Sequence, residues 1–521
     1  MRHSTRMLNS RALCSRARVL VSAPIRFVVL LGSLSLALGR ELRAQSAPAP
    51  ADSLPPSYRE RESAMATRSF ALLWTATPRR FVAAWDSALS ADQRALLAVR
   101  AEAPVAVWER EAMRLRLRHA WGRTMWPYFH WRETDASSVV PDTAVAFLVR
   151  DLPLADTKWW GVPEHMQLVS ALVHERARAL LASNRALQRG DVRWLRAEMA
   201  AARALFADRA LQRHVSTQLI TAHLDENDER GIDSVYGAWK SLAPDSVVVA
   251  RVDSMIAAST ALRVGHLIES YKMVNGVPLE LHLLRPVAGD TVGARPAMLW
   301  FHGGSGNTGS WSHSPGVVRN LRANGVTVVA VEFRTGTRFD AGPVEQYNDA
   351  VAALAYVRKH AARLGLDAKR IGVAGFSSGA GLALSLGTRG INPVRPAPRP
   401  SRRVYPAAVI AMGTCVAPAS PREDGYFRKM VRKVGDPKDF SPIDLVAAGQ
   451  PPTLLLHGTN DEYCAYQDVE ALVARSRAVG NNITLSSVAG ATHFFGFSYR
   501  PGQAQMRDAM TAALTAWGWM R

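Results

Sequence analysis

The chain has 521 residues, of which 48% are hydrophobic and 21% are charged. This composition suffices for two domains with packed cores and excludes a fibrous or disordered chain. The formal net charge of +20 is of the size found in nucleic-acid-binding proteins, but eight arginines precede residue 45 and the rest are spread without a nucleic-acid-binding motif. We therefore expect no nucleic-acid partner.

Residues 1–45 have the pattern of a secretory signal peptide: an Arg-rich start, an apolar run at 27–38, and small residues near Ala44. We therefore expect an exported protein, periplasmic or secreted. The apolar run is shorter than the roughly 20 residues that span a bilayer. An uncleaved anchor is the alternative to a signal peptide, and we expect no stable membrane insertion once the segment is removed. A Pro/Ala/Ser-rich linker follows at 46–57.

Two cysteines remain after the signal peptide, Cys415 and Cys464, because Cys14 would be removed with it. An exported protein meets a compartment that permits disulfides, so these two residues are a candidate pair. The sequence does not give the distance between them. A disulfide and two free buried thiols both stay open.

Residues 58–262 are predicted to form a helical domain, rich in Ala, Arg, Leu and Trp. Apolar residues recur at steps of three and four, which places them on one face of a helix. The clearest such set is Val192, Leu195, Met199, Ala202, Leu205 and Phe206, and an earlier one is Met166, Val169, Leu172 and Val173. Two such faces predict an antiparallel array of helices.

No metal or function is indicated for this helical half. His174 and Glu175 resemble the start of a zinc-protease motif, but Arg178 stands where the second histidine of that motif is needed. The tryptophans of this half are interpreted as core and interface residues rather than a sugar-binding platform.

Residues 264–521 show a different periodicity, with strands alternating with helices. Two alternating stretches flank Asn275-Gly276, the favoured turn of a β-hairpin. The strands expected after the hairpin are Ala297–Phe301, Val326–Phe333, Ile371–Gly375, Ala407–Met412, Thr453–His457 and Ile483–Val488. Near-continuous apolar strands separated by helices predict an α/β domain with a mostly parallel sheet covered on both faces. Functional residues of such sheets lie at the carboxyl ends of the strands.

Ser377 is the candidate nucleophile, because it lies in a Gly-x-Ser-x-Gly motif between an apolar strand and a helix-forming stretch. Glycines on both sides of the serine permit a tight turn that projects the hydroxyl from the sheet edge. The motif alone is common in glycine-rich loops, so its interpretation depends on partner residues elsewhere in the chain.

A second motif, His302-Gly303-Gly304-Ser305-Gly306, directly follows a predicted strand. Backbone amides of Gly304 and Ser305, with that of Ser378, are candidates to hold the negative charge that acyl transfer builds on a carbonyl oxygen. A phosphate-binding loop is excluded because Ser310 stands where the motif needs a lysine.

Two further candidates follow later strands. Asp461 lies four residues past a buried strand and is the candidate to orient a histidine, with Glu462 as a competitor and Asp468 as a weaker one. His493 follows the last strand and is the candidate general base. Ser, Asp and His then occur in the chain order that Gly-x-Ser-x-Gly enzymes use.

On these motifs, residues 264–521 resemble the α/β-hydrolase superfamily, near its secreted esterases and the hormone-sensitive-lipase-like or carbohydrate-esterase-like branch. The resemblance implies Ser377 as nucleophile, Asp461 as acid and His493 as base, with oxyanion amides from Gly304, Ser305 and Ser378. Ser305 replaces the third glycine of the family's His-Gly-Gly-Gly motif, which leaves the subfamily open.

We therefore expect an exported serine esterase that needs no cofactor or metal and acts on a small-molecule or carbohydrate ester. A peptidase of the same fold, acting on short peptides, and a non-catalytic interaction protein with a hydrolase-like scaffold are the alternatives. The sequence does not indicate the acyl or alcohol group, the oligomeric state, or the role of residues 58–262.

Overall fold

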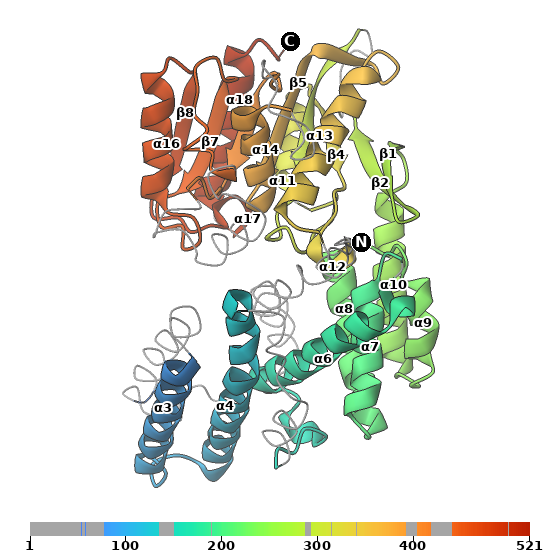
Figure 1. The fold of residues 1–521 in the computed structure, drawn as a ribbon, viewed down its shortest axis with the longest axis vertical. Helices are drawn as coiled ribbons and strands as arrows, with labels where there is room; N and C mark the ends of the chain where they lie inside the picture. Colours follow the sequence, from blue (N-terminus) through green and yellow to red (C-terminus); the bar gives the residue numbers. More distant parts are fainter. Residues whose placement is uncertain are drawn as a thin grey trace, which may run out of the picture.

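The computed structural model consists of a helical segment up to residue 262 and an eight-stranded sheet with its own helices after it (Figure 1). The described residues are 54, 58, 78–134, 151–188, 190–286, 293–313, 315–339, 341–391, 404–417, 440–498 and 500–520. The predicted signal peptide and most of the predicted linker lie outside them.

The helical segment, as the name is used below, comprises the helices before residue 263. They are α3 (Pro78–Ala98), α4 (Val105–Thr134), α6 (Pro163–Ser183), α7 (Arg193–Leu205), α8 (Arg209–Glu226), α9 (Asp233–Lys240) and α10 (Ser246–Leu262), with short 3-10 turns η1 (Thr157–Trp159) and η2 (Arg185–Gln188). Local sequence features mark the first residues of several of these helices. Asp208 caps α8 by accepting a hydrogen bond from the amide of Leu211 at 2.7 Å, and Pro163 occupies the first turn of α6.

Helix α7 is buried on two sides, which is more than its periodicity predicted. Val192, Leu195 and Met199 face a core shared with α8, α9 and α10. Trp194 and Ala201 belong to a different core, shared with α4 and α6. Leu205 was expected on the buried face, but it ends the helix and is 39% exposed. A helix placed between two cores has no fully solvated side, so a one-face pattern understates its burial.

The sheet has the order β1-β2-β4-β3-β5-β6-β7-β8. Its strands are β1 (Leu267–Val274), β2 (Val277–Leu284), β3 (Arg295–Phe301), β4 (Thr327–Val331), β5 (Leu366–Phe376), β6 (Val409–Met412), β7 (Thr453–Gly458) and β8 (Ile483–Val488). The β1-β2 hairpin turns at Asn275 and Gly276, both with positive φ, and pairs antiparallel to β4. All the other pairings are parallel. The predicted fold class, a mostly parallel α/β sheet preceded by helices, is confirmed.

Helices cover both faces of the sheet, as the apolar strands predicted. Alternate residues of one strand therefore enter different cores: Val329 and Val331 pack with α13 (Pro343–Lys359) and α14 (Ser378–Arg389), whereas Val328 and Ala330 pack with α11 (Pro315–Ala323) and α18 (Arg500–Ala516). Helix α16 (Tyr466–Ala478) joins the first face. These two hydrophobic cores fix the sheet and hence the positions of its carboxyl ends.

The carboxyl edge of the sheet faces the helical segment. Two short helices mark this edge in Figure 1: α12 (Gly336–Phe339), which follows β4, and α17 (Phe495–Ser498), which follows β8. Helix α12 lies next to α7 and α8. Among the described helices, none combines the length and apolar character that crossing a membrane requires.

Candidate active site

Ser377 sits at the sharp turn from β5 into α14, with φ 54° and ψ −122°. A non-glycine residue in such a conformation carries strain of about 1–3 kcal/mol and is held there by its surroundings. Its amide donates to the carbonyl of Met412 at 2.9 Å. A Cβ at Gly375 would overlap the backbone of Gly379, and one at Gly379 would overlap the backbone of Phe301. The two motif glycines are therefore required by close packing around the serine.

His493 bridges the other two candidates. Its ring lies in the turn after β8, where its Nε2 is 3.0 Å from Oγ of Ser377 and its Nδ1 is 2.8 Å from Oδ2 of Asp461. The residue is only 3% exposed, and the ring of Phe376 lies against it. The carboxylate fixes the tautomer: Nδ1 donates to Asp461, so Nε2 is left as the acceptor for the serine proton.

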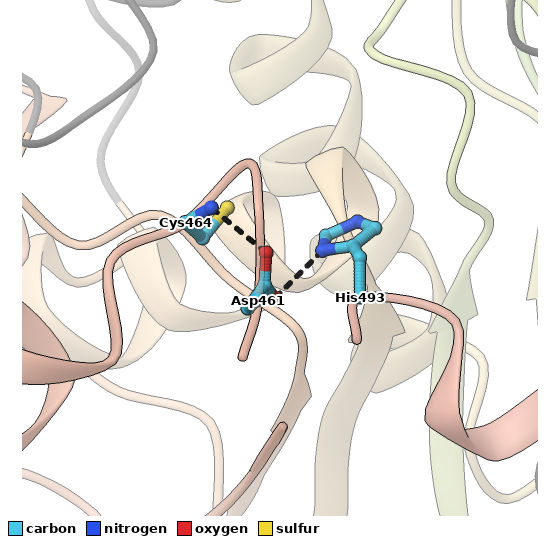
Figure 2. A group of neighbouring side chains, drawn as sticks. All are labelled: Asp461, Cys464 and His493. Carbon is cyan, nitrogen blue, oxygen red and sulfur yellow. Dashed lines mark hydrogen bonds and ion pairs between the residues drawn. The ribbon is translucent and has the colours of Figure 1, made fainter. Parts of the chain in front are cut away.

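Asp461 lies in the turn after β7 and is held by amides as well as by the histidine (Figure 2). Its Oδ1 accepts hydrogen bonds from the amides of Cys464 at 2.8 Å and Tyr463 at 2.9 Å. Burial by itself would raise the pKa of Asp461, but the hydrogen bond and charge of His493 lower it below its usual value. The carboxylate is therefore ionised at neutral pH.

The competing carboxylates have other contacts. Glu462 accepts a hydrogen bond from the backbone amide of His493 at 3.1 Å, so it supports the turn and not the ring. Asp468 is buried in the first turn of α16. The structure thus brings together Ser377, His493 and Asp461 from the three turns that the sequence indicated.

A second histidine, His457, also contacts Asp461 and was not anticipated. It is buried in β7, where its Nε2 is 3.2 Å from Oδ2 of Asp461 and 2.9 Å from the carbonyl of Cys464. Burial lowers the pKa of His457, so the ring is neutral. Its place four residues before Asp461, at the end of an apolar strand, is the signal in the sequence that could have revealed it.

The disulfide candidate is bonded in the structure. The sulfurs of Cys415 and Cys464 are 2.09 Å apart, which links the turn after β6 to the turn that carries Asp461. Asp461, Cys464 and His493 also lie close enough to share a metal ion (Figure 2). A disulfide sulfur is no thiolate ligand, so this donor set does not suit a metal.

A second group of potential metal ligands is Glu280, His282 and Glu332, on β2 and just after β4. Arginines already bind both of its carboxylates: Arg263 donates to Glu280 at 2.7 Å, and Arg230 binds Glu332. These cations would have to leave before a metal could enter, so the group is an ion-pair network and not a metal site.

The glycine loop, residues 302–309, lies beside the nucleophile. A Cβ at Gly303 would be 3.3 Å from Cβ of Ser377. Gly304 and Ser305 both have positive φ, 118° and 55°. Within the described chain, the amides of Gly304, Ser305 and Ser378 have no backbone acceptor. The loop beside the serine thus contains backbone amides without a backbone acceptor, a feature that an oxyanion hole requires.

His302 starts this loop as a structural residue. It is 2% exposed, stacks on Phe333 with ring centroids 4.4 Å apart, and donates from Nδ1 to the carbonyl of Gly303 at 2.7 Å. Burial lowers the pKa of His302 to about 3, so it stays neutral and takes no part in proton transfer.

A mostly parallel sheet with a serine, a histidine and an aspartate hydrogen-bonded in series at its carboxyl edge is an α/β-hydrolase fold. Residues 286–394 match the protein family described as BD-FAE. An ethyl acetate hydrolase from Pseudomonas putida is 27% identical over 237 residues, which cover 42% of this chain and 72% of that protein.

Among solved structures, the propionate-bound esterase Est2 from Thermogutta terrifontis is 25% identical and has a TM-score of 0.44; the match covers 50% of this chain and 96% of that one. The same esterase phosphonylated by sarin gives 25% identity and a TM-score of 0.45, with 50% and 97% of the two chains covered.

Proposed function

We propose that the protein is a carboxylic ester hydrolase in which Ser377 is the nucleophile, His493 the general base and Asp461 the residue that orients it. The observation that carries this proposal is the hydrogen-bonded series from Ser377 Oγ to His493 Nε2 and from His493 Nδ1 to Asp461, at 3.0 and 2.8 Å. The similarity to an ethyl acetate hydrolase and the BD-FAE match support an ester as the substrate.

The mechanism proceeds in two halves. His493 Nε2 takes the hydroxyl proton while Ser377 Oγ attacks the ester carbonyl, and the imidazolium formed is stabilised by the ionised Asp461. His493 then protonates the leaving alcohol, which departs and leaves an acyl-enzyme. Water, deprotonated by the same Nε2, attacks the acyl carbon and releases the acid and free Ser377.

The negative charge of each tetrahedral intermediate would be held by amides of Gly304, Ser305 and Ser378. Losing one such donor typically slows catalysis about a hundred- to a thousandfold. Ser305 can serve in place of a glycine because the donor is its backbone amide. The aromatic side chains of Phe376, Tyr463 and Phe494 surround His493 and would give the acyl or alcohol group an apolar surface.

Hydrolysis of p-nitrophenyl acetate tests this function. The Ser377→Ala variant should lose activity by about six orders of magnitude, because removing a triad nucleophile has an effect of that order. Ser234→Ala, which alters an exposed serine on α9, should match the parent protein. A fluorophosphonate probe should label the parent and not Ser377→Ala. Undiminished hydrolysis by folded Ser377→Ala would refute the proposal, and parallel assays with an amide of the same acyl group would detect a peptidase.

We also propose that the protein is exported, with residues 1–45 removed. The Arg-rich start and apolar run of this segment support it, and a disulfide next to the site suits an oxidising compartment. Fractionation of expressing cells, with N-terminal sequencing of the product, tests this. Full-length protein in the cytoplasmic fraction would contradict it.

A further inference from the structure

We propose that the helical segment positions the glycine loop for catalysis, through an ion pair between Arg338 on α12 and Asp191 before α7. The inference rests on the proposed function of that loop as the oxyanion hole. It assigns a role to the part of the chain for which the sequence indicated none. Two separate connections from the helical segment to the loop support it.

The first connection is direct. Helix α8 ends at Glu226, whose carbonyl accepts a hydrogen bond from the amide of Gly309 at 2.8 Å. The last carbonyls of a helix have no partner within it, so α8 offers this acceptor by its position. Gly309 has φ 115°, and a Cβ there would overlap both the ring of His302 and the carbonyl of Gly303. The end of α8 therefore holds the glycine loop at the point where the first and last residues of the loop lie together.

The second connection passes through α12. The amides of Gly336 and Thr337 donate to the carbonyls of Gly306 at 3.1 Å and Asn307 at 2.9 Å, and Oγ1 of Thr337 also donates to Asn307 at 2.9 Å. The middle of the glycine loop is thus fixed to the start of α12. A helix of four residues is not stable by itself, so α12 depends on other contacts for its place.

Those contacts come from Arg338. Its guanidinium binds Asp191 with two parallel hydrogen bonds, Nε to Oδ1 at 2.7 Å and Nη2 to Oδ2 at 2.6 Å, and its Nη1 lies 3.7 Å from Asp228. Asp191 precedes α7 and Asp228 follows α8, so both acids belong to the helical segment. Arg338 is only 5% exposed. A bidentate pair of this kind fixes orientation as well as distance.

Arg338 and Asp228 both stay charged at this junction. Burial by itself would lower the pKa of Arg338, but Asp228 and Asp191 raise it above its usual value. Burial would likewise raise the pKa of Asp228, which Arg338 and Arg230 lower. Removing one member would leave a buried charge without its partner, so α12 would have to move or admit water. Because α12 holds the carbonyls of Gly306 and Asn307, a shift of α12 would also move the glycine loop.

The same interface contains an ion pair that does not touch α12 or the loop. Arg263, after α10, binds Glu280 on β2 at 2.7 Å, with side-chain exposures of 19% and 13%. It joins the helical segment to the sheet as Arg338 does, yet it ends on a strand away from the nucleophile. Glu280 also binds Arg230, which pairs with Asp228, so Arg263 is linked to Arg338 only indirectly. Arg263→Met is therefore a control that loosens the interface without a direct change at α12.

The experiment compares Asp191→Asn, Arg338→Met and Arg263→Met in the full chain. With p-nitrophenyl acetate, the first two should lower kcat by roughly 10- to 100-fold and change KM less than about threefold, because a misplaced oxyanion donor acts on the transition state. Their affinity for a trifluoromethyl ketone, which mimics the tetrahedral intermediate, should fall in proportion to kcat/KM. Arg263→Met should stay within about twofold of the parent.

A double variant tests whether Asp191 and Arg338 act through the same interaction. If Asp191 and Arg338 act as one unit, Asp191→Asn with Arg338→Met should be no slower than the worse single variant, whereas independent effects would multiply. Unchanged kcat in both single variants, or an equal loss in Arg263→Met, would overturn the proposal. Thermal unfolding establishes that each variant is folded.

Hydrogen exchange tests the connection without using esterase activity. The amides of residues 302–309 should exchange faster in Asp191→Asn and Arg338→Met than in the parent, and those of β3 should not. Loop exchange equal to the parent would disprove the positioning role even if the protein hydrolyses esters. Faster loop exchange in the two variants, found together with a parent protein that hydrolyses no ester, would support the connection while the proposed function fails.

Discussion

Nε2 of His493 lies 3.0 Å from Oγ of Ser377, although 116 residues separate them in the chain. The sheet order explains this proximity. Ser377 follows β5 and His493 follows β8, with β6 and β7 between them, and the histidine turn reaches back over the carboxyl ends of these strands. Gly413, after β6, has φ 57° and lies against the histidine ring. The pair depends on the register of four parallel strands.

The identity of the acid can be tested by amide substitution. Asp461→Asn should lower kcat/KM by about ten thousandfold, because an amide favours the wrong histidine tautomer and cannot stabilise the imidazolium. Glu462→Gln should cost less than about tenfold, since Glu462 contacts only the backbone amide of His493. Steady-state hydrolysis of p-nitrophenyl acetate by both variants gives the comparison. A larger loss in Glu462→Gln would reverse the assignment.

The disulfide should affect stability and activity together. The bridge spans 49 residues, so loop entropy predicts that its loss lowers the free energy of unfolding by about 4 kcal/mol. Activity should also fall, because the amide of Cys464 holds Oδ1 of Asp461. Urea unfolding and ester hydrolysis, with and without dithiothreitol, measure both effects.

Cys415→Ser is the control for this reduction. It should reproduce the reduced protein and no longer respond to dithiothreitol. Full activity and stability in Cys415→Ser would show that the bridge does not support the Asp461 turn.

Much of the site could be predicted because each residue lies in a local pattern. Ser377 sits between two glycines, and Asp461 and His493 each follow an apolar strand. A parallel sheet brings such strand ends to one edge, so local patterns are enough to predict a shared site. The choice between Asp461 and Glu462 needed the structure, because adjacent residues in a turn point in different directions.

The link between Asp191 and Arg338 could not be predicted. The two residues are 147 positions apart, and neither lies in a recognised motif. Their pairing depends on how α7 docks against α12, which is a property of tertiary packing and not of periodicity. For the same reason, the one-face pattern of α7 did not predict that this helix is buried between two cores.

The glycine loop should be intolerant of side chains at Gly304. This residue has φ 118°, and a Cβ there would overlap the carbonyl of Thr308. Gly304→Ala should therefore strain the loop, displace its amides and lower kcat by about a hundredfold or more. Gly316→Ala is the matched control, because that exposed glycine on α11 has no atom within 4 Å of the added Cβ. Equal kcat in the two variants would show that loop geometry does not limit catalysis.

Buried neutral histidines should make the fold sensitive to mild acid. Burial lowers the pKa of His302 to about 3 and that of His282 to about 2, against 6.5 for an unperturbed ring. Below pH 6.5 these histidines bind protons in the unfolded chain but not in the folded chain, so stability falls as pH falls. From pH 7.5 to pH 5, each ring should lower the free energy of unfolding by about 2 kcal/mol.

His282→Phe isolates one of these contributions. Phenylalanine keeps a flat ring against Trp311, on which His282 stacks with centroids 3.8 Å apart, but it cannot bind a proton. Urea unfolding at pH 7.5 and pH 5 should show a smaller acid-induced loss in this variant than in the parent, by about 2 kcal/mol. The comparison uses the difference between two pH values, so any constant effect of the substitution cancels. An unchanged difference would mean that His282 becomes protonated in the folded state.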